Sequence, residues 1–327
     1  MKGRMKIMVA YDGSAYADAA LDDLRRAGLP RKAEALIVSV GNGLVPAFSP
    51  VEEVAGAALA SRRVTTAIAA AREQSVRLLA EARRFAAHAR RRVLSHFPKW
   101  EVRTRVLEGE PSRELLRKAE EWGPDLVVVG SQGRSALGRF FLGSVSKALA
   151  AKARGAVRVG RRGIGKDDAA PPRLVVGVDG SPGAREAVFA VATRAWPAGT
   201  EVRLVVVDDG SDMTRAAGVR PRLEEVFTGR DESPPINAHL MAEGARVVLA
   251  DAGLNAPVEM REGDPRRVLA DEAREWRADA IFVGSHGLSH LDGSSGLGGV
   301  ASALVTGAAC SVEVVRADGP RKRAGET

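Results

Sequence analysis

The sequence predicts an α/β protein built from two tandem, doubly wound domains, each with a five-stranded parallel sheet. Three observations predict this fold class. The chain has 327 residues, about twice the length of a typical domain. One order of short strand-like and longer helix-like segments occurs twice along it. The strand-like segments are nearly continuous apolar runs, as expected of parallel strands that are covered on both faces.

The repeat is visible in the letters of the sequence. KIMVAYDGSAYADAAL, from Lys6, matches RLVVGVDGSPGAREAV, from Arg173, and PDLVVVGSQG, from Pro124, matches ADAIFVGSHG, from Ala278. Between these landmarks the order of elements is shared as well. We therefore divide the chain into a first domain, a linker rich in polar residues, Gly and Pro, a second domain and a charged tail: residues 1–160, 161–172, 173–317 and 318–327.

The first copy contains five strand-like runs, and enough chain separates them for crossover helices. They are residues 6–11, 34–40, 102–107, 125–130 and 156–160. Helix starts are marked by capping residues: Ser14, Ser181 before Pro182, and Asp264 before Pro265. The copies differ most after the second strand. The first has an Ala/Arg helix pattern over about 51–97, and the second has a polar loop before a shorter helix at 238.

Composition excludes several classes of protein. The chain has no apolar run of about 18 residues, and its N-terminus lacks the apolar segment of a signal peptide, so we expect a cytoplasmic protein without a membrane partner. The single cysteine, Cys310, excludes an intrachain disulfide, and we interpret it as a small buried residue. The net charge of +8 comes from arginines interleaved with acids, with few aromatics, which favours solvated helix faces over a nucleic-acid partner.

The predicted ligand site lies where the first and fourth strands end, because open parallel sheets bind ligands beyond those ends. Gly143 and Ser144 begin a predicted helix, whose free N–H groups and partial positive charge suit phosphates. Arg134 and Arg139, in the preceding loop, add positive charge. Asp12, at the tip of the first strand, can accept a hydrogen bond from a ribose hydroxyl or a base amino group.

The glycines have a recognisable spacing. Gly130, Gly133, Gly143 and Ser144 follow the pattern Gly-x2-Gly-x9-Gly-Ser/Thr, in which the chain resembles the nucleotide-binding members of the universal stress protein family over nearly all of both copies. The resemblance implies a Rossmann-like fold and an ATP-binding sensor or regulator of the stress response. It implies that the protein is not an enzyme, although weak ATP hydrolysis stays open. It also implies ATP, with or without Mg, as the cofactor. It places the nucleotide against Ala10, Tyr11, Asp12, Val40, Val129, Gly130, Gly133, Arg134, Gly143, Ser144, Val145 and Ser146.

Other interpretations stay open beside this one. The glycines could serve a turn in a dimerisation scaffold that binds no nucleotide, or the chain could be an ATP-cleaving enzyme on a related fold. We interpret Ser14 as a helix cap rather than a nucleophile. GRRGIGKD, from Gly160, fits a phosphate-binding loop except that Asp167 stands where Ser or Thr is needed, so we assign it to the linker. A zinc site of His286, His290 and Asp292 is disfavoured by its glycine-rich context.

The second copy departs from the glycine pattern. Ten residues rather than nine separate Gly287 from Gly298, Gly299 replaces the serine, and the intervening loop contains Asp292 without an arginine. We therefore expect a degenerate nucleotide site in the second domain.

The resemblance also implies pairing through the final strands, either between the two copies or in a homodimer. Antiparallel pairing of 156–160 with 311–315 would set Arg158 opposite Glu313, and exchanging the two charges should preserve it. The alternative is that both residues lie on a solvated edge strand.

Overall fold

The computed structural model describes residues 4–41, 58–134, 142–161, 170–209, 238–287 and 296–317. Several predicted features fall outside these ranges: Arg139, Asp167, most of the linker, His290, Asp292 and the charged tail.

The described strands form one continuous sheet of ten strands. Its order is β3-β2-β1-β4-β5-β10-β9-β6-β7-β8. Neighbours within each half are parallel, and β5 and β10, which join the halves, are antiparallel. The predicted fold class is confirmed, and the two sheets merge into one. The strands are β1 (Met5–Ala10), β2 (Ala33–Gly41), β3 (Glu101–Glu108), β4 (Leu126–Gly130), β5 (Ala156–Gly160), β6 (Arg173–Gly177), β7 (Glu201–Asp208), β8 (Val258–Glu262), β9 (Ala280–Gly284) and β10 (Ser311–Val315).

The helices begin where the capping residues predict. Ser14 accepts a hydrogen bond from the Ala17 N–H at 3.1 Å, and Ser181 and Asp264 cap α5 and α9 in the same way. The cap assignment of Ser14 is therefore confirmed. The helices are α1 (Ala15–Asp23), followed by the short 3-10 helix η1 (Leu24–Arg26), α2 (Ala58–His96), α3 (Pro111–Trp122), α4 (Ser144–Lys152), α5 (Pro182–Ala192), α8 (Ala238–Asp251), α9 (Pro265–Glu275) and α10 (Gly299–Gly307).

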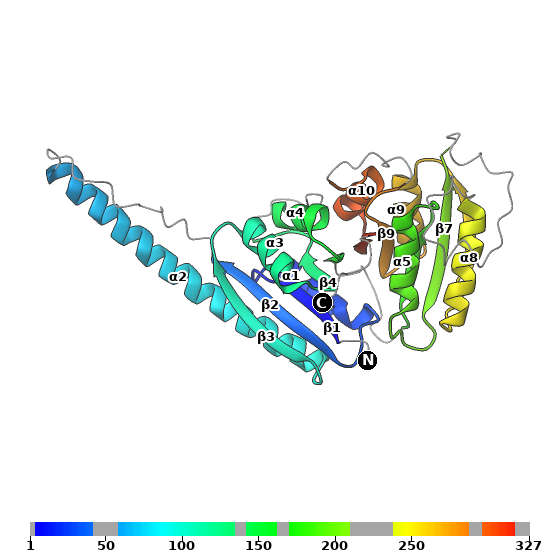
Figure 1. The fold of residues 1–327 in the computed structure, drawn as a ribbon, viewed down its shortest axis with the longest axis horizontal. Helices are drawn as coiled ribbons and strands as arrows, with labels where there is room; N and C mark the ends of the chain where they lie inside the picture. Colours follow the sequence, from blue (N-terminus) through cyan, green and yellow to red (C-terminus); the bar gives the residue numbers. More distant parts are fainter. Residues whose placement is uncertain are drawn as a thin grey trace, which may run out of the picture.

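Helices cover both faces of the sheet because each strand buries alternate side chains on opposite sides. In β1, Met8 packs in a core under α3 and α4, while Ile7 and Val9 pack in a second core under α1 and α2. The first of these cores continues under α9 and α10 of the second half, so one apolar layer spans both domains. The long α2 extends well beyond the sheet (Figure 1).

The junction between the halves has the predicted register. Arg158 of β5 lies opposite Glu313 of β10, between two pairs of valines. The pairing prediction is confirmed. The solvated-edge alternative is wrong, because both Arg158 and Glu313 are fully buried.

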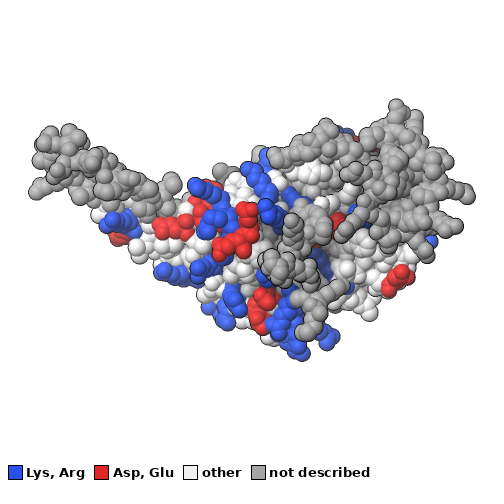
Figure 2. Space-filling view, in the orientation of Figure 1, with Lys and Arg blue, Asp and Glu red and all other residues white. Residues whose placement is uncertain are grey.

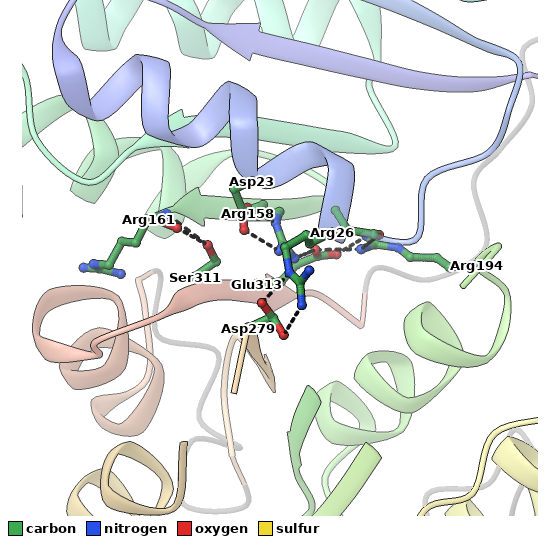
Figure 3. Close-up of polar contacts among 9 residues, drawn as sticks. Asp23, Arg26, Arg158, Arg161, Arg194, Asp279, Ser311 and Glu313 are labelled. Atoms are coloured by element: carbon green, nitrogen blue, oxygen red, sulfur yellow. Dashed lines mark hydrogen bonds and ion pairs between the residues drawn. The ribbon is translucent and has the colours of Figure 1, made fainter. Parts of the chain in front are cut away.

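The pair belongs to a larger buried network (Figure 3). The Arg158 guanidinium donates to Asp23 at 2.6 Å and to Glu313 at 3.2 Å, and Arg194 donates to Glu313 at 2.9 Å. These four side chains are at most 6% exposed. Burial by itself would lower the pKa of Arg158, but the carboxylates of Asp23 and Glu313 outweigh burial and raise that pKa. The network is thus charged and internally balanced.

Two arginines, one from each half, form hydrogen bonds across the junction. Arg161, just after β5, donates to the Val305 carbonyl in the last turn of α10, while Arg316, just after β10, donates to the Ala150 carbonyl in α4 at 2.6 Å. Each half thus supplies a cation to the C-terminal end of a helix in the other half, where the helix dipole favours positive charge.

Three expectations from the composition concern the surface charges, the single cysteine and membrane-spanning segments. On the face shown in Figure 2, basic and acidic side chains are interspersed. Cys310 is buried, as predicted. In the part of the chain that the structure describes, we find no helix that combines the length and the apolar character needed to span a membrane.

Candidate functional site

A cavity opens where the strand order reverses. β1 and β4 are neighbours in the sheet, but the strand that follows β1 lies on one side of this pair and the strand that follows β4 lies on the other. A cavity of about 770 Å³ lies at the C-terminal ends of β1 and β4. All the residues against which the family resemblance places the nucleotide line this cavity, from β1, β2, β4, the loops after β1 and β4, and the start of α4, whereas Arg139 lies outside the described residues. The structure thus brings the predicted set together, within a volume that suits a small-molecule ligand.

The turn after β1 forms one wall of the cavity. Asp12 accepts a hydrogen bond from the Ser14 N–H at 3.0 Å, which fixes the turn into α1. The Tyr11 hydroxyl donates to Asp18 at 2.6 Å. Burial and this hydrogen bond to a carboxylate raise the pKa of Tyr11, so the phenol stays protonated and this wall carries no tyrosinate charge.

The two glycines after β4 have different reasons to be glycine. A Cβ on Gly130 would lie 2.7 Å from the Tyr16 backbone, so α1 can pack against β4 only if position 130 has no side chain. A Cβ on Gly133 would lie 3.2 Å from Asp12 Oδ2, across the cavity mouth. Gly130 therefore serves helix packing, whereas Gly133 keeps the approach to Asp12 open.

The start of α4 forms the opposite wall. Gly143 is the N-cap and Ser144 is exposed. The N–H groups of a first helical turn have no acceptor inside the helix, so they can bind an anion. Ser146, which lines the cavity, also has a structural contact. Its buried hydroxyl donates to the Gly130 carbonyl at 2.6 Å and ties α4 to β4.

Arg134 points to a partner that the sequence analysis did not identify. Its guanidinium donates to both carboxylate oxygens of Glu81 in α2, at 2.9 and 3.0 Å, and lies 5.0 Å from the centre of the Phe85 ring. Arg134, which we expected to bind a phosphate, is thus already paired with the carboxylate of Glu81.

Comparison with known proteins places this chain in a family. The model of the universal stress protein family matches residues 3–159 and again 172–316. The chain belongs to the universal stress protein family. A universal stress protein of Mycolicibacterium smegmatis is 32% identical over 222 residues, 66% of this chain and 69% of the relative. One of Mycobacterium tuberculosis is 30% identical over 235 residues, covering 67% and 70%.

The family fold extends to solved structures. A universal stress protein from Archaeoglobus fulgidus superposes with a TM-score of 0.60 and 17% identity, covering 96% of this chain and 98% of that one. The tandem arrangement of this universal stress protein is therefore shared with a known structure.

The long α2 contributes part of the cavity that sequence reasoning missed. Leu78, Glu81, Ala82 and Phe85 line it at helical spacing, and Glu110, Pro111 and Leu115 line it from the start of α3. The spacing of the α2 residues indicated one helix face. Nothing in that pattern showed which strand ends the face would cover.

Two glycines of the second domain, Gly287 and Gly298, have closer neighbours than their counterparts Gly133 and Gly143 in the first. A Cβ on Gly287 would lie 2.6 Å from Asp179, and one on Gly298 would lie 3.1 Å from the Ser285 carbonyl, whereas Gly143 has 3.4 Å to its nearest neighbour. α10 begins at Gly299, so the hydroxyl present at Ser144 is missing there. Within the described ranges, no group of three or more His, Cys, Asp or Glu residues could hold a metal ion.

Proposed function

We propose that this universal stress protein binds an adenine nucleotide in the cavity of its first domain and acts as a nucleotide-responsive regulator. By family resemblance the nucleotide is ATP, with or without magnesium. The observation that supports the proposal is that all the residues against which the family resemblance places the nucleotide line one cavity. The lining combines apolar side chains, among them Val38, Val40 and Leu115, with the start of α4, and these suit a base and phosphates respectively.

A regulatory role is favoured over catalysis by what the hydroxyl groups do. Ser14, the candidate nucleophile, caps α1, and Ser146 is bonded to the Gly130 carbonyl. Both hydroxyls hold elements in place. We expect one nucleotide site per chain, because the second domain lacks the serine at the start of α10 and is tighter around Gly287 and Gly298.

Calorimetric titration of the full chain with ATP tests the proposal. The expected result is one site per chain. Gly143→Val places a branched side chain at the α4 start and should weaken binding at least about tenfold, or about 1.4 kcal/mol.

Gly299→Val, at the start of α10 in the second domain, is a control for adding the same side chain, because nothing lies within 4 Å of a Cβ there, and it should leave ATP binding unchanged. Two equal sites would contradict the asymmetry. An unchanged affinity in Gly143→Val would contradict the phosphate role of the α4 start.

A further inference from the structure

Glu81 is an acidic group in a cavity that the proposed function assigns to an anion. It projects from α2 into the lining of the first-domain cavity, where its two carboxylate oxygens accept from the two terminal nitrogens of Arg134. A bidentate pair of this kind fixes the direction of a guanidinium more firmly than a single contact. The pair is partly exposed, at 36% for Glu81 and 52% for Arg134, so a ligand can reach it.

Phe85 holds the same arginine from a second side. The Arg134 guanidinium lies over the Phe85 ring, and that ring packs so closely on Gly13 that a Cβ there would lie 2.4 Å from it. One turn of α2, from Glu81 to Phe85, therefore contacts both the loop after β1 and the loop after β4. Arg134 stays beside the cavity mouth, with its charge directed at Glu81.

The described charged side chains of the lining are mainly acidic. They comprise the carboxylates of Asp12, Glu81 and Glu110 and the guanidinium of Arg134. Glu110 accepts from the Ser112 and Arg113 N–H groups, and Asp12 accepts from the Ser14 N–H. Glu81 differs from these two because its partner is the cation that a phosphate would use. Each further phosphate charge on a ligand increases its repulsion by Glu81.

We propose that Glu81 is a specificity-determining residue that competes with ligand phosphates for Arg134 and lowers the affinity of the cavity for multiply charged nucleotides relative to uncharged nucleosides. This inference rests on the proposed nucleotide site. A ligand phosphate that takes Arg134 leaves the Glu81 carboxylate without its cation, and the cost rises with the charge of the ligand. Adenosine, which carries no phosphate, leaves the pair intact.

Titration of the full chain with adenosine, AMP and ATP tests this, at fixed ionic strength and without divalent cations so that each ligand has a defined charge. Glu81→Gln should bind ATP about fivefold more tightly, the upper range for a partly exposed ion pair, and AMP by a smaller factor. Its affinity for adenosine should stay that of the wild type. Glu73→Gln is the matched control, because it removes the same charge from a 66% exposed glutamate two turns earlier in α2.

A second variant separates competition from positioning. Arg134→Gln should weaken ATP binding more in the Glu81→Gln background than in the wild type, because Glu81 no longer occupies the guanidinium there. The inference is overturned if Glu81→Gln leaves the ratio of ATP to adenosine affinity unchanged, or if it weakens ATP binding, which would make Glu81 a support for Arg134. If adenosine binds but Glu81→Gln does not change the ratio of ATP to adenosine affinity, only this inference is wrong and the proposed function stands. Failure of all three ligands to bind removes the proposed function with it.

Discussion

A single missing side chain decides how the first helix meets the sheet. Because a Cβ at Gly130 would meet the Tyr16 backbone at 2.7 Å, Gly130→Ala should lower the free energy of unfolding by about 1–3 kcal/mol. At Gly143 the nearest atom to a Cβ is 3.4 Å away, so Gly143→Ala should cost less than about 1 kcal/mol. Urea denaturation of both variants checks this. Equal losses would show that the close approach of α1 does not explain Gly130.

The residue scale also shows what the sequence could tell about the site. Gly133 and Gly143 were predicted from the glycine spacing of the family and Asp12 from its place at the end of the first strand, and all three line the cavity. Glu81 and Phe85 were missed. They lie about 50 residues before Arg134 on a helix whose apolar pattern indicates a buried face without naming what that face meets.

At the scale of elements, α3 begins with a charged cap. The Glu110 carboxylate accepts from the Arg113 N–H at 2.7 Å and from the Ser112 N–H at 3.0 Å, and these bonds hold the pKa of Glu110 below its ordinary value. A carboxyl whose pKa is lower in the folded state stabilises the fold above its unfolded pKa of 4.5, and that contribution is lost as the pH falls through the lower folded value.

Glu110→Gln should therefore be less stable than the wild type by up to about 1 kcal/mol at neutral pH, and the difference should shrink as the pH falls below 4.5. Thermal unfolding between neutral and acidic pH measures it. Glu120→Gln, at a surface glutamate of the same helix, controls for the loss of one charge. A difference that does not change with pH would contradict the role of the ionised cap.

At the scale of the whole molecule, the junction depends on charges that have no access to water. Glu313 accepts from both Arg158 and Arg194, so Glu313→Gln leaves buried positive charge uncompensated and should cost about 3–5 kcal/mol. Glu259→Gln breaks a partly exposed pair with Arg261 and should cost less than about 1 kcal/mol. Urea denaturation compares the two, and similar losses would show that the buried network contributes little.

The network also changes the expected result of a charge exchange. Considered as an isolated pair, Arg158→Glu with Glu313→Arg should restore the junction. In the structure, Arg158→Glu would place a second carboxylate beside Asp23. Glu313→Arg would place a second guanidinium beside Arg194. We therefore expect the double variant to unfold more easily than the wild type in the same denaturation series. Full recovery would mean that Asp23 and Arg194 are not coupled to the pair.

The strands, caps and cross-junction register could be predicted because they depend on short apolar runs, local capping residues and the repeat. The extra members of the buried network could not be predicted. Asp23 lies on α1 and Arg194 just after α5, and only the packing of one half on the other brings these two positions to the same junction.

The Arg158–Glu313 pair has a consequence for the history of the chain. In a symmetric dimer, residues at the two-fold axis face their own copies, so any residue there must tolerate itself. A tandem chain removes that requirement, and here the two positions carry opposite charges. Once both charges are in place, neither half can return to self-association through this strand without burying like charges. Two chains produced by cutting at the linker should therefore pair with each other through this strand rather than each with a copy of itself.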